Sequence, residues 1–183
     1  YCGGAFDDET GTFWLPLGGG HSDYGGNESY KIPLNVDSPA WSMVRPPSGS
    51  TTLIAGGLPV GSTPLANSYV LDDGLEASGI YADGRPRATH SYGKHVHVPG
   101  LGIVMALHGG GFSNAAPSPK FVWWLNESTN EWEWKSTAAS PVVTYSNSSY
   151  AAFDKTRGCI YLQVDGTSPL LRLDLTNWTY NNV

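Results

Sequence analysis

The sequence predicts an all-β fold, and three observations lead to that prediction. No window keeps apolar residues at the i, i+3, i+4 and i+7 positions of a helix without an interrupting glycine or proline. Short runs of β-branched and aromatic residues alternate with turn residues instead. The 183 residues are 40% hydrophobic and 14% charged and include 23 glycines, a composition that favours a folded domain over a disordered chain.

The short runs recur as a unit of four predicted strands. In the first and second units the second strand ends in three glycines, and in the third unit it ends in Asp165-Gly166. A tryptophan lies at or near the start of every fourth strand. We expect strands at 2–7, 12–17, 28–34 and 40–45; at 90–98, 102–107, 120–125 and 131–136; and at 149–154, 159–164, 170–175 and 178–182.

The spacing within the units agrees as well. Phe6 to Trp41 is 35 positions (41 minus 6), and Val98 to Trp132 is 34 (132 minus 98). A four-stranded unit that repeats every roughly 40 to 50 residues is typical of a propeller blade. The sequence therefore predicts a single propeller segment over 1–183, with blades at 1–47, 86–140 and 141–183.

An insertion is predicted at 48–85, between the first and second blades. This stretch is rich in Gly, Pro, Ser and Thr and is too long for an ordinary connection. The chain begins at Tyr1 without an initiator methionine or a signal-peptide pattern. We therefore expect it to be part of a longer polypeptide or a processed product.

Charge and cysteine content exclude several classes of function. Ten Lys and Arg against sixteen Asp and Glu give a net charge of −6, which disfavours nucleic acid as a partner. No apolar run approaches the roughly 20 residues that a spanning helix needs. Cys2 and Cys159 are too few and too far apart for a disulfide framework or a zinc knuckle. We expect buried thiols, with a single disulfide as the less favoured alternative.

The glycine run, an aromatic residue in the third strand and the tryptophan of the fourth strand resemble the kelch repeat. The segments 18–28 and 83–92 also resemble a group of microbial and phage kelch-type proteins often described as galactose-oxidase-like. The resemblance implies a ring of about six or seven blades, completed by further blades or by a protein partner. It also favours an extracellular, cell-surface or virion location. The copper-ligand motifs of galactose oxidase have no match here, so neither a metal nor a cofactor is expected.

One face of the ring is the predicted ligand-binding face. In a four-stranded meander, the loop from the second to the third strand and the loop from the fourth strand to the next blade emerge on the same face. We expect these loops to contact a small ligand or a glycan through His21, Asp23, Tyr24, Asn27, Arg85 and Arg87.

Each candidate also has a structural interpretation. His21 with Asp23 suits general acid–base chemistry or half of a metal pair, but such residues also hold glycine-rich turns. Arg85 and Arg87 suit the carboxylate or sulfate of an acidic sugar, but they could equally pair with Asp83, Asp23 or a neighbouring blade.

Two further patterns carry chemistry. His95 and His97 are two positions apart on a predicted strand, so both point to one face with acceptable metal-ligand spacing, but no third ligand is evident. Trp132 and Trp134 share a face of their strand and suit either packing between blades or stacking on sugars.

The sequence favours a non-enzymatic binding or architectural module that contacts a glycan or another structural protein. An alternative is a polysaccharide lyase or hydrolase, which would use His21, Asp23, Arg85, His90 and Tyr92. A third interpretation is a purely structural virion or assembly protein. A fold of this kind does not by itself decide among the three.

Overall fold

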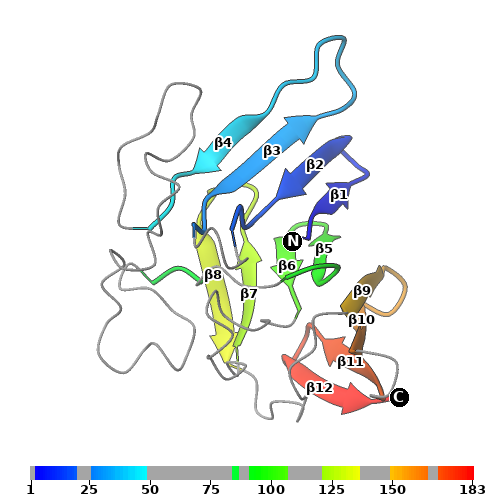
Figure 1. The fold of residues 1–183 in the computed structure, drawn as a ribbon. Coiled ribbons are helices and arrows are strands. Elements are labelled where there is room, and N and C mark those ends of the chain that lie inside the picture. Colours follow the sequence, from blue (N-terminus) through cyan, green and yellow to red (C-terminus); the bar gives the residue numbers. More distant parts are fainter. Residues whose placement is uncertain are drawn as a thin grey trace.

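The computed structural model describes residues 3–19, 26–48, 84–86, 91–106, 121–136, 149–164 and 169–183. These ranges contain twelve strands and no helix, and the strands form three four-stranded antiparallel sheets (Figure 1). The all-β prediction is therefore confirmed, and the sheets are arranged as blade-like segments of a propeller. Within these ranges no helix is long and apolar enough to cross a bilayer.

Each blade is a meander whose strands pair in chain order. Blade 1 consists of β1 (Ala5–Asp7), β2 (Thr12–Leu15), β3 (Ser29–Pro33) and β4 (Ser42–Arg45). Blade 2 consists of β5 (His95–Val98), β6 (Gly102–Met105), β7 (Phe121–Leu125) and β8 (Trp132–Ser136). Blade 3 consists of β9 (Ser149–Asp154), β10 (Cys159–Val164), β11 (Leu170–Asp174) and β12 (Thr179–Asn182).

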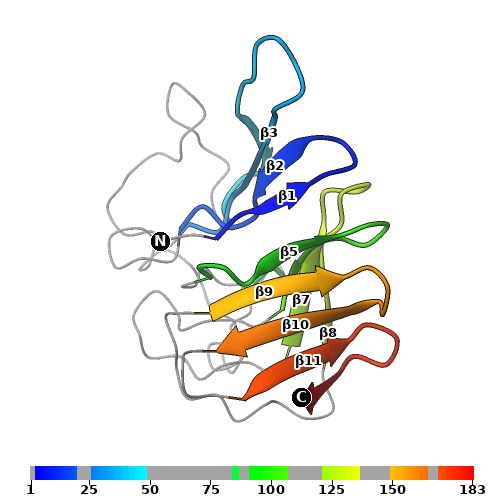
Figure 2. The ribbon, with the colours of Figure 1, turned by 90° about the vertical axis from the view of Figure 1, so that its right-hand side faces the viewer.

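The first strands of the three blades lie side by side, with β5 between β1 and β9 (Figure 2). Hydrogen bonds join them at one end. The Ala151 amide donates to the Gly93 carbonyl at 2.8 Å, and the Gly3 amide donates to the Ser91 hydroxyl at 3.1 Å. Gly3 must be glycine, because a Cβ there would lie 1.3 Å from the carbonyl oxygen of Tyr92.

The opposite end of the blades, which we call the hairpin end, repeats one turn structure. In four hairpins, a side-chain oxygen of an Asp or Asn accepts hydrogen bonds from the backbone amides two and three residues later, at 2.8 to 3.4 Å. Such Asx turns fix the hairpin length and end the strand. The turn-forming residues are Asp7, Asn126, Asp154 and Asp174, and the residues four positions on, all with positive φ, are Gly11, Asn130, Gly158 and Trp178.

The strand registers define equivalent positions in the three blades. One rung of each sheet crosses the first three strands. In blades 2 and 3 this rung faces the preceding blade, and its apolar residues lie in the layer between blades. The rungs are Phe6, Phe13 and Ile32 in blade 1; His97, Ile103 and Leu125 in blade 2; and Phe153, Ile160 and Leu173 in blade 3.

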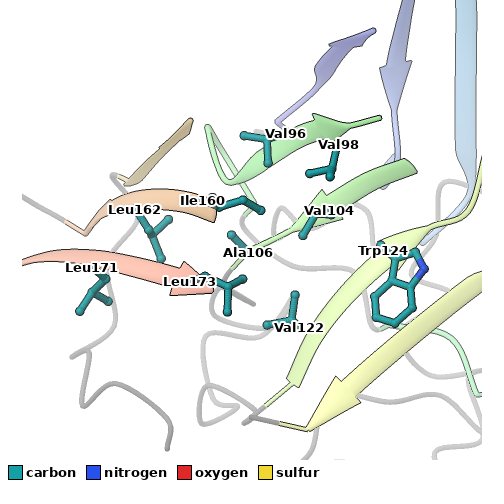
Figure 3. Close-up of a cluster of buried hydrophobic side chains, with 10 residues drawn as sticks. All are labelled: Val96, Val98, Val104, Ala106, Val122, Trp124, Ile160, Leu162, Leu171 and Leu173. Carbon is teal, nitrogen blue, oxygen red and sulfur yellow. The ribbon is translucent and has the colours of Figure 1, made fainter. Parts of the chain in front are cut away.

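Two layers of buried side chains hold the blades together. The blade 1–2 interface is rich in aromatic residues and includes Trp14, Trp123 and Trp132. The blade 2–3 interface is mainly aliphatic (Figure 3). At its margin Trp178 stacks on Trp124 with ring centroids 4.9 Å apart, and the Tyr180 hydroxyl donates to the Ala106 carbonyl. The apolar area buried in these two layers is the main source of stability for such an assembly.

Candidate functional site

Three residues of the predicted ligand-binding face and of the alternative catalytic set lie in the described part of the chain: Asn27, Arg85 and Tyr92. The others lie outside the described residues: His21, Asp23, Tyr24, Arg87 and His90. The predicted roles of both groups remain predictions.

Asn27 is fully buried and connects the two ends of the predicted insertion at 48–85. Its Nδ2 donates to the Ser48 hydroxyl at 2.8 Å and to the Pro86 carbonyl at 2.9 Å. Its Oδ1 accepts the Ser48 amide at 2.7 Å. These bonds satisfy both amide hydrogens, so a ligand that needed a donor from Asn27 would have to displace Ser48 or Pro86.

Arg85 and Tyr92 also make contacts within the chain. The Arg85 Nη1 donates to the Pro46 carbonyl at 2.5 Å, so the guanidinium connects the two flanks of the insertion. Tyr92 has a positive φ of 35°, an uncommon conformation for a bulky residue, and its carbonyl lies against Gly3. Asn27 and Arg85 therefore share a place in the fold, at the base of the insertion.

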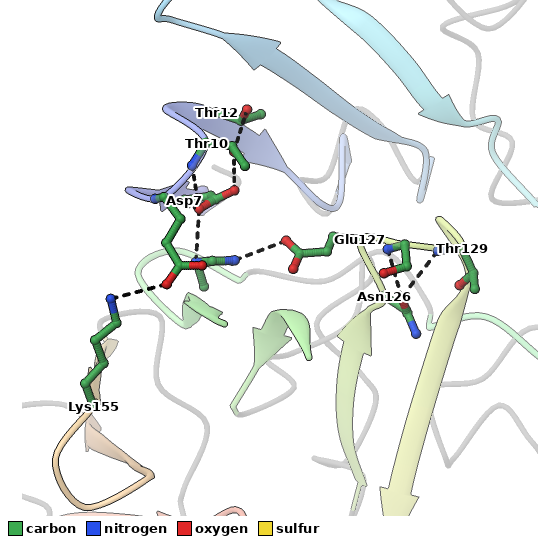
Figure 4. Close-up of polar contacts among 10 residues, drawn as sticks. Asp7, Thr10, Thr12, Asn126, Glu127, Thr129 and Lys155 are labelled. Carbon is green, nitrogen blue, oxygen red and sulfur yellow. Dashed lines mark hydrogen bonds and ion pairs between the residues drawn. The ribbon is translucent and has the colours of Figure 1, made fainter. Parts of the chain in front are cut away.

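A different polar cluster lies at the hairpin end, between blades 1 and 2 (Figure 4). As the sequence predicts, His95 and His97 point to one face of their strand, and that face is turned toward blade 1. His95 Nδ1 contacts the Gly3 carbonyl at 2.9 Å. His97 Nδ1 lies 3.5 Å from Asp7 Oδ1, and its Nε2 lies 3.1 Å from Glu127 Oε2. The two histidines therefore contact different groups.

Asp7 is 2% exposed, and its carboxylate is held by its own turn. Oδ1 accepts the Glu9 amide at 2.9 Å and the Thr10 amide at 3.2 Å, and Oδ2 accepts the Thr10 hydroxyl. Burial acts to raise the pKa of Asp7, but the bonds from Thr10 and Glu9 and the attraction of His97 outweigh it and hold the pKa below its usual range. The carboxyl group is therefore ionised at neutral pH.

Asp8 completes the cluster from the solvent side. One ligand atom each of Asp7, Asp8 and His97 lies within 4.8 Å of the other two. The Asp8 side chain is 70% exposed, and its Oδ2 lies 3.9 Å from Lys155 Nζ of blade 3. Lys155 also approaches Glu9 Oε1 at 3.5 Å. Three hairpins, one from each blade, thus place charged groups around the buried imidazole.

No third ligand for His97 is evident in the sequence, because the local sequence around Asp7 is that of a tight turn. The structure shows that Asp7 forms this turn, and that its carboxylate also faces His97. One signal could have pointed to His97. The equivalent positions of the other two blades hold Phe6 and Phe153, so a histidine interrupts an aromatic pattern.

The tryptophans mainly pack between blades. Trp123, Trp124 and Trp132 are at most 8% exposed, whereas Trp134 is 45% exposed and lies beside Trp123 with ring centroids 6.1 Å apart. Cys159 is buried with a free thiol, as expected, and Cys2 lies outside the described residues.

Comparison with known proteins adds no identity: no protein-family model and no curated protein matches this chain. The fold is therefore established at the level of its architecture, which is three four-stranded antiparallel blades of a propeller-like assembly.

Proposed function

We propose that this chain is a kelch-type propeller segment that acts as a non-enzymatic binding or architectural module, and that the face of blade 1 turned away from blade 2 is its docking surface for a further blade. That blade belongs to the same polypeptide or to a partner protein. One observation carries the proposal: an apolar sheet face without a covering blade among the described residues.

The open face of blade 1 consists of Phe6, Phe13, Ile32 and Trp41. Phe6 is 50% exposed and Trp41 is 54% exposed. The Phe13 and Trp41 rings meet edge to face with centroids 6.1 Å apart. Contiguous apolar surface of this kind marks an interaction site more often than an ordinary solvent-exposed surface.

The registers support a blade as the occupant of this face. Phe13 is equivalent to Ile103 and Ile160, and both of those are fully buried against the preceding blade. Ile32 is equivalent to Leu125 and Leu173, which are also fully buried. The open face therefore repeats a surface that blades 2 and 3 use to pack on their neighbours.

The outer face of blade 3 is more polar. Alternation along its strands places Tyr150, Tyr161, Gln163 and Arg172 on the side away from blade 2. Tyr150 is 73% exposed. A partner on this side would need hydrogen-bonding groups, so the two ends of the segment differ in the chemistry they offer.

The alternative, a polysaccharide lyase or hydrolase, receives no support from the described residues. Of its five proposed residues, Arg85 and Tyr92 are described: Arg85 donates to the Pro46 carbonyl, and the carbonyl of Tyr92 lies against Gly3. A binding or architectural role requires no assembled catalytic group, and we favour it for that reason.

The test is the molar mass of the purified chain in solution, measured by size-exclusion chromatography with light scattering over a range of concentrations. We expect concentration-dependent association of the wild type through the open face. The double variant Phe6→Ser/Trp41→Ser should shift the mass toward the monomer while the circular dichroism spectrum stays unchanged.

A matched control removes similar apolar side chains from outside the sheet face. Leu34 and Val36, which are 51% and 47% exposed, lie in the β3–β4 connection. Leu34→Ser/Val36→Ser should leave the association unchanged. A wild type that is monomeric at every concentration, or a control that dissociates as readily as the open-face variant, would overturn the proposal.

A further inference from the structure

We propose that Asp7, Asp8 and His97 form a binding site for a divalent transition-metal ion of the Zn²⁺ class, which joins the β1–β2 hairpin of blade 1 to β5 of blade 2. Glu127 supports this site by holding the far side of the imidazole. The proposal does not depend on the function proposed above, because it concerns an internal interface and not the open face.

The hydrogen bond to Glu127 determines which nitrogen is available. His97 Nε2 lies 3.1 Å from Glu127 Oε2, so Nε2 carries a proton and donates it. In the neutral ring Nδ1 then has a lone pair, and this lone pair faces Asp7 Oδ1 at 3.5 Å. In that neutral form the two electron-rich atoms repel each other unless a proton or a metal ion lies between them.

The carboxylate of Asp7 has capacity for one more contact. Its two oxygens offer about four acceptor positions. Three of them are used by the Glu9 amide, the Thr10 amide and the Thr10 hydroxyl. Two of these bonds go to Oδ1 and one to Oδ2, so the remaining position is on Oδ2, which is the oxygen left for a metal ion.

The side chains come within coordination distance after a movement of about 1 to 1.5 Å. Bonds of about 2.0 to 2.2 Å from a tetrahedral zinc ion to nitrogen and oxygen place the ligand atoms about 3.3 to 3.6 Å apart. In the structure, the three ligand atoms lie within 4.8 Å of one another. Asp8 can supply the adjustment, because its side chain is exposed and its contact with Lys155 is long at 3.9 Å.

The donor set favours one class of ion. An imidazole nitrogen with carboxylate oxygens suits Zn²⁺ and its transition-metal neighbours, whereas Ca²⁺ and Mg²⁺ prefer oxygen ligands alone. A histidine whose second nitrogen donates to a carboxylate is the usual outer-shell arrangement of such sites. His97 has this arrangement through Glu127, and its side chain is only 4% exposed.

The register adds an independent argument. At the equivalent position of the blade 2–3 interface, Phe153 packs against the apolar cluster, and the position of Asp7 is taken by Val98. An apolar pair therefore satisfies the same geometry. A buried histidine and aspartate at these positions depart from the apolar pattern, and such departures occur mainly at functional sites.

The experiment is a Zn²⁺ titration of the chelator-treated chain in competition with a chromophoric chelator, followed by Co²⁺ substitution to record visible absorption. We expect one ion per chain. Asp8→Asn should weaken Zn²⁺ binding at least about tenfold, because it removes a ligand from the exposed side without disturbing the buried turn. Glu127→Gln should weaken binding by about tenfold through the orientation of His97.

Glu9→Gln is the matched control. Glu9 is an exposed carboxylate on the same turn, approaches Lys155 as Asp8 does, and lies outside the proposed ligand set. It should leave the affinity within about twofold, as expected for a residue outside the coordination shells. Equal losses in Asp8→Asn and Glu9→Gln would show diffuse attraction to negative charge and overturn the site.

NMR of the ring nitrogens of His97 distinguishes a metal ion from a proton. Added Zn²⁺ should shift the Nδ1 resonance and leave Nε2 protonated. A ring that carries protons on both nitrogens before and after Zn²⁺ addition would overturn the proposal, since His97 would then be an imidazolium between two carboxylates. Failure to bind Zn²⁺ in the titration would overturn it as well.

Discussion

The two interfaces between blades are formed by equivalent strand positions but differ in chemistry at the hairpin end. In the blade 1–2 interface, Asp7 of one blade faces His97 of the next at 3.5 Å. In the blade 2–3 interface the equivalent positions hold Val98, which belongs to the apolar cluster, and Phe153, which packs against it. The fold therefore tolerates either a polar or an apolar pair here, and the polar pair is not required for the blades to pack.

The difference shows where each interface obtains its stability. Fully buried aliphatic side chains dominate the blade 2–3 interface, and their contribution scales with buried apolar area. The blade 1–2 interface combines buried tryptophans with a charged cluster, whose net contribution depends on every member having a partner. The blade 2–3 interface should therefore keep its stability when a nearby charge is changed, whereas the blade 1–2 interface should lose stability.

The largest effect is expected from Ile160→Ala in the blade 2–3 interface. Ile160 is fully buried, so the variant should lose about 2 to 4 kcal/mol of unfolding free energy in urea denaturation. Ile32→Ala makes the same chemical change on the open face of blade 1 and should cost about 1 kcal/mol or less. Equal losses would mean that the open face is covered in solution.

The next effect concerns His97→Phe, which gives the blade 1–2 interface the residue that blade 3 has at this position. With chelator present, we expect a loss of about 1 to 3 kcal/mol, because Asp7 and Glu127 lose their common partner. Asp7→Asn/His97→Phe should recover more than half of the loss, since Asn126 shows that asparagine supports the same turn. If His97→Phe alone were as stable as the wild type, the two interfaces would not differ in their dependence on a polar pair.

A third prediction concerns Lys94, which lies opposite Ala106 and is fully buried beside the blade 2–3 interface. Burial lowers the pKa of Lys94 from 10.5 to about 8. Between these values the unfolded chain binds a proton that the folded chain does not, so the contribution of Lys94 makes stability rise with pH from about 8 to 10.5.

Lys94→Met should abolish this rise and should stabilise the protein at pH 7 by on the order of 1 kcal/mol. The measurement is the unfolding free energy at a series of pH values from neutral to alkaline. Lys135→Met, at an exposed position of β8, should keep the wild-type pH profile. A Lys94→Met profile parallel to the wild type would show that the amine reaches solvent.

The smallest effect is expected from Lys155→Gln. Its contacts with Asp8 and Glu9 connect blade 3 to blade 1 across the hairpin end, but all three side chains are more than half exposed. We expect a change within about 0.5 kcal/mol at low salt that disappears at high salt. A larger, salt-resistant loss would place these contacts among the forces that hold the blades together.

Most of the fold was predictable from the sequence because its determinants are local. Alternating apolar residues and short turns predicted all twelve strands, and the bounds of β9 and β10 agree with the predicted ranges 149–154 and 159–164. The prediction was less accurate for β5, which was expected to begin at residue 90 but begins at His95. Alternation also predicted correctly that His95 and His97 share a face.

The candidate metal site was not predictable in the same way. Asp7 and His97 are 90 positions apart (97 minus 7), and their proximity depends on how two blades pack. The local sequence of Asp7 encodes an Asx turn, which gives no indication of a partner in another blade. Comparing equivalent positions of the blades, once the registers are known, identifies His97 as the exception.

The position of Asn27 also matters for how the molecule can be altered. One amide nitrogen donates to both Ser48 and Pro86, so the ends of the predicted insertion at 48–85 meet at a single buried side chain. A chain segment whose ends are held together can change in length at a small cost in loop-closure entropy. This contact is therefore a natural grafting point, at which evolution or a protein engineer could exchange the intervening segment for another and leave the three blades intact.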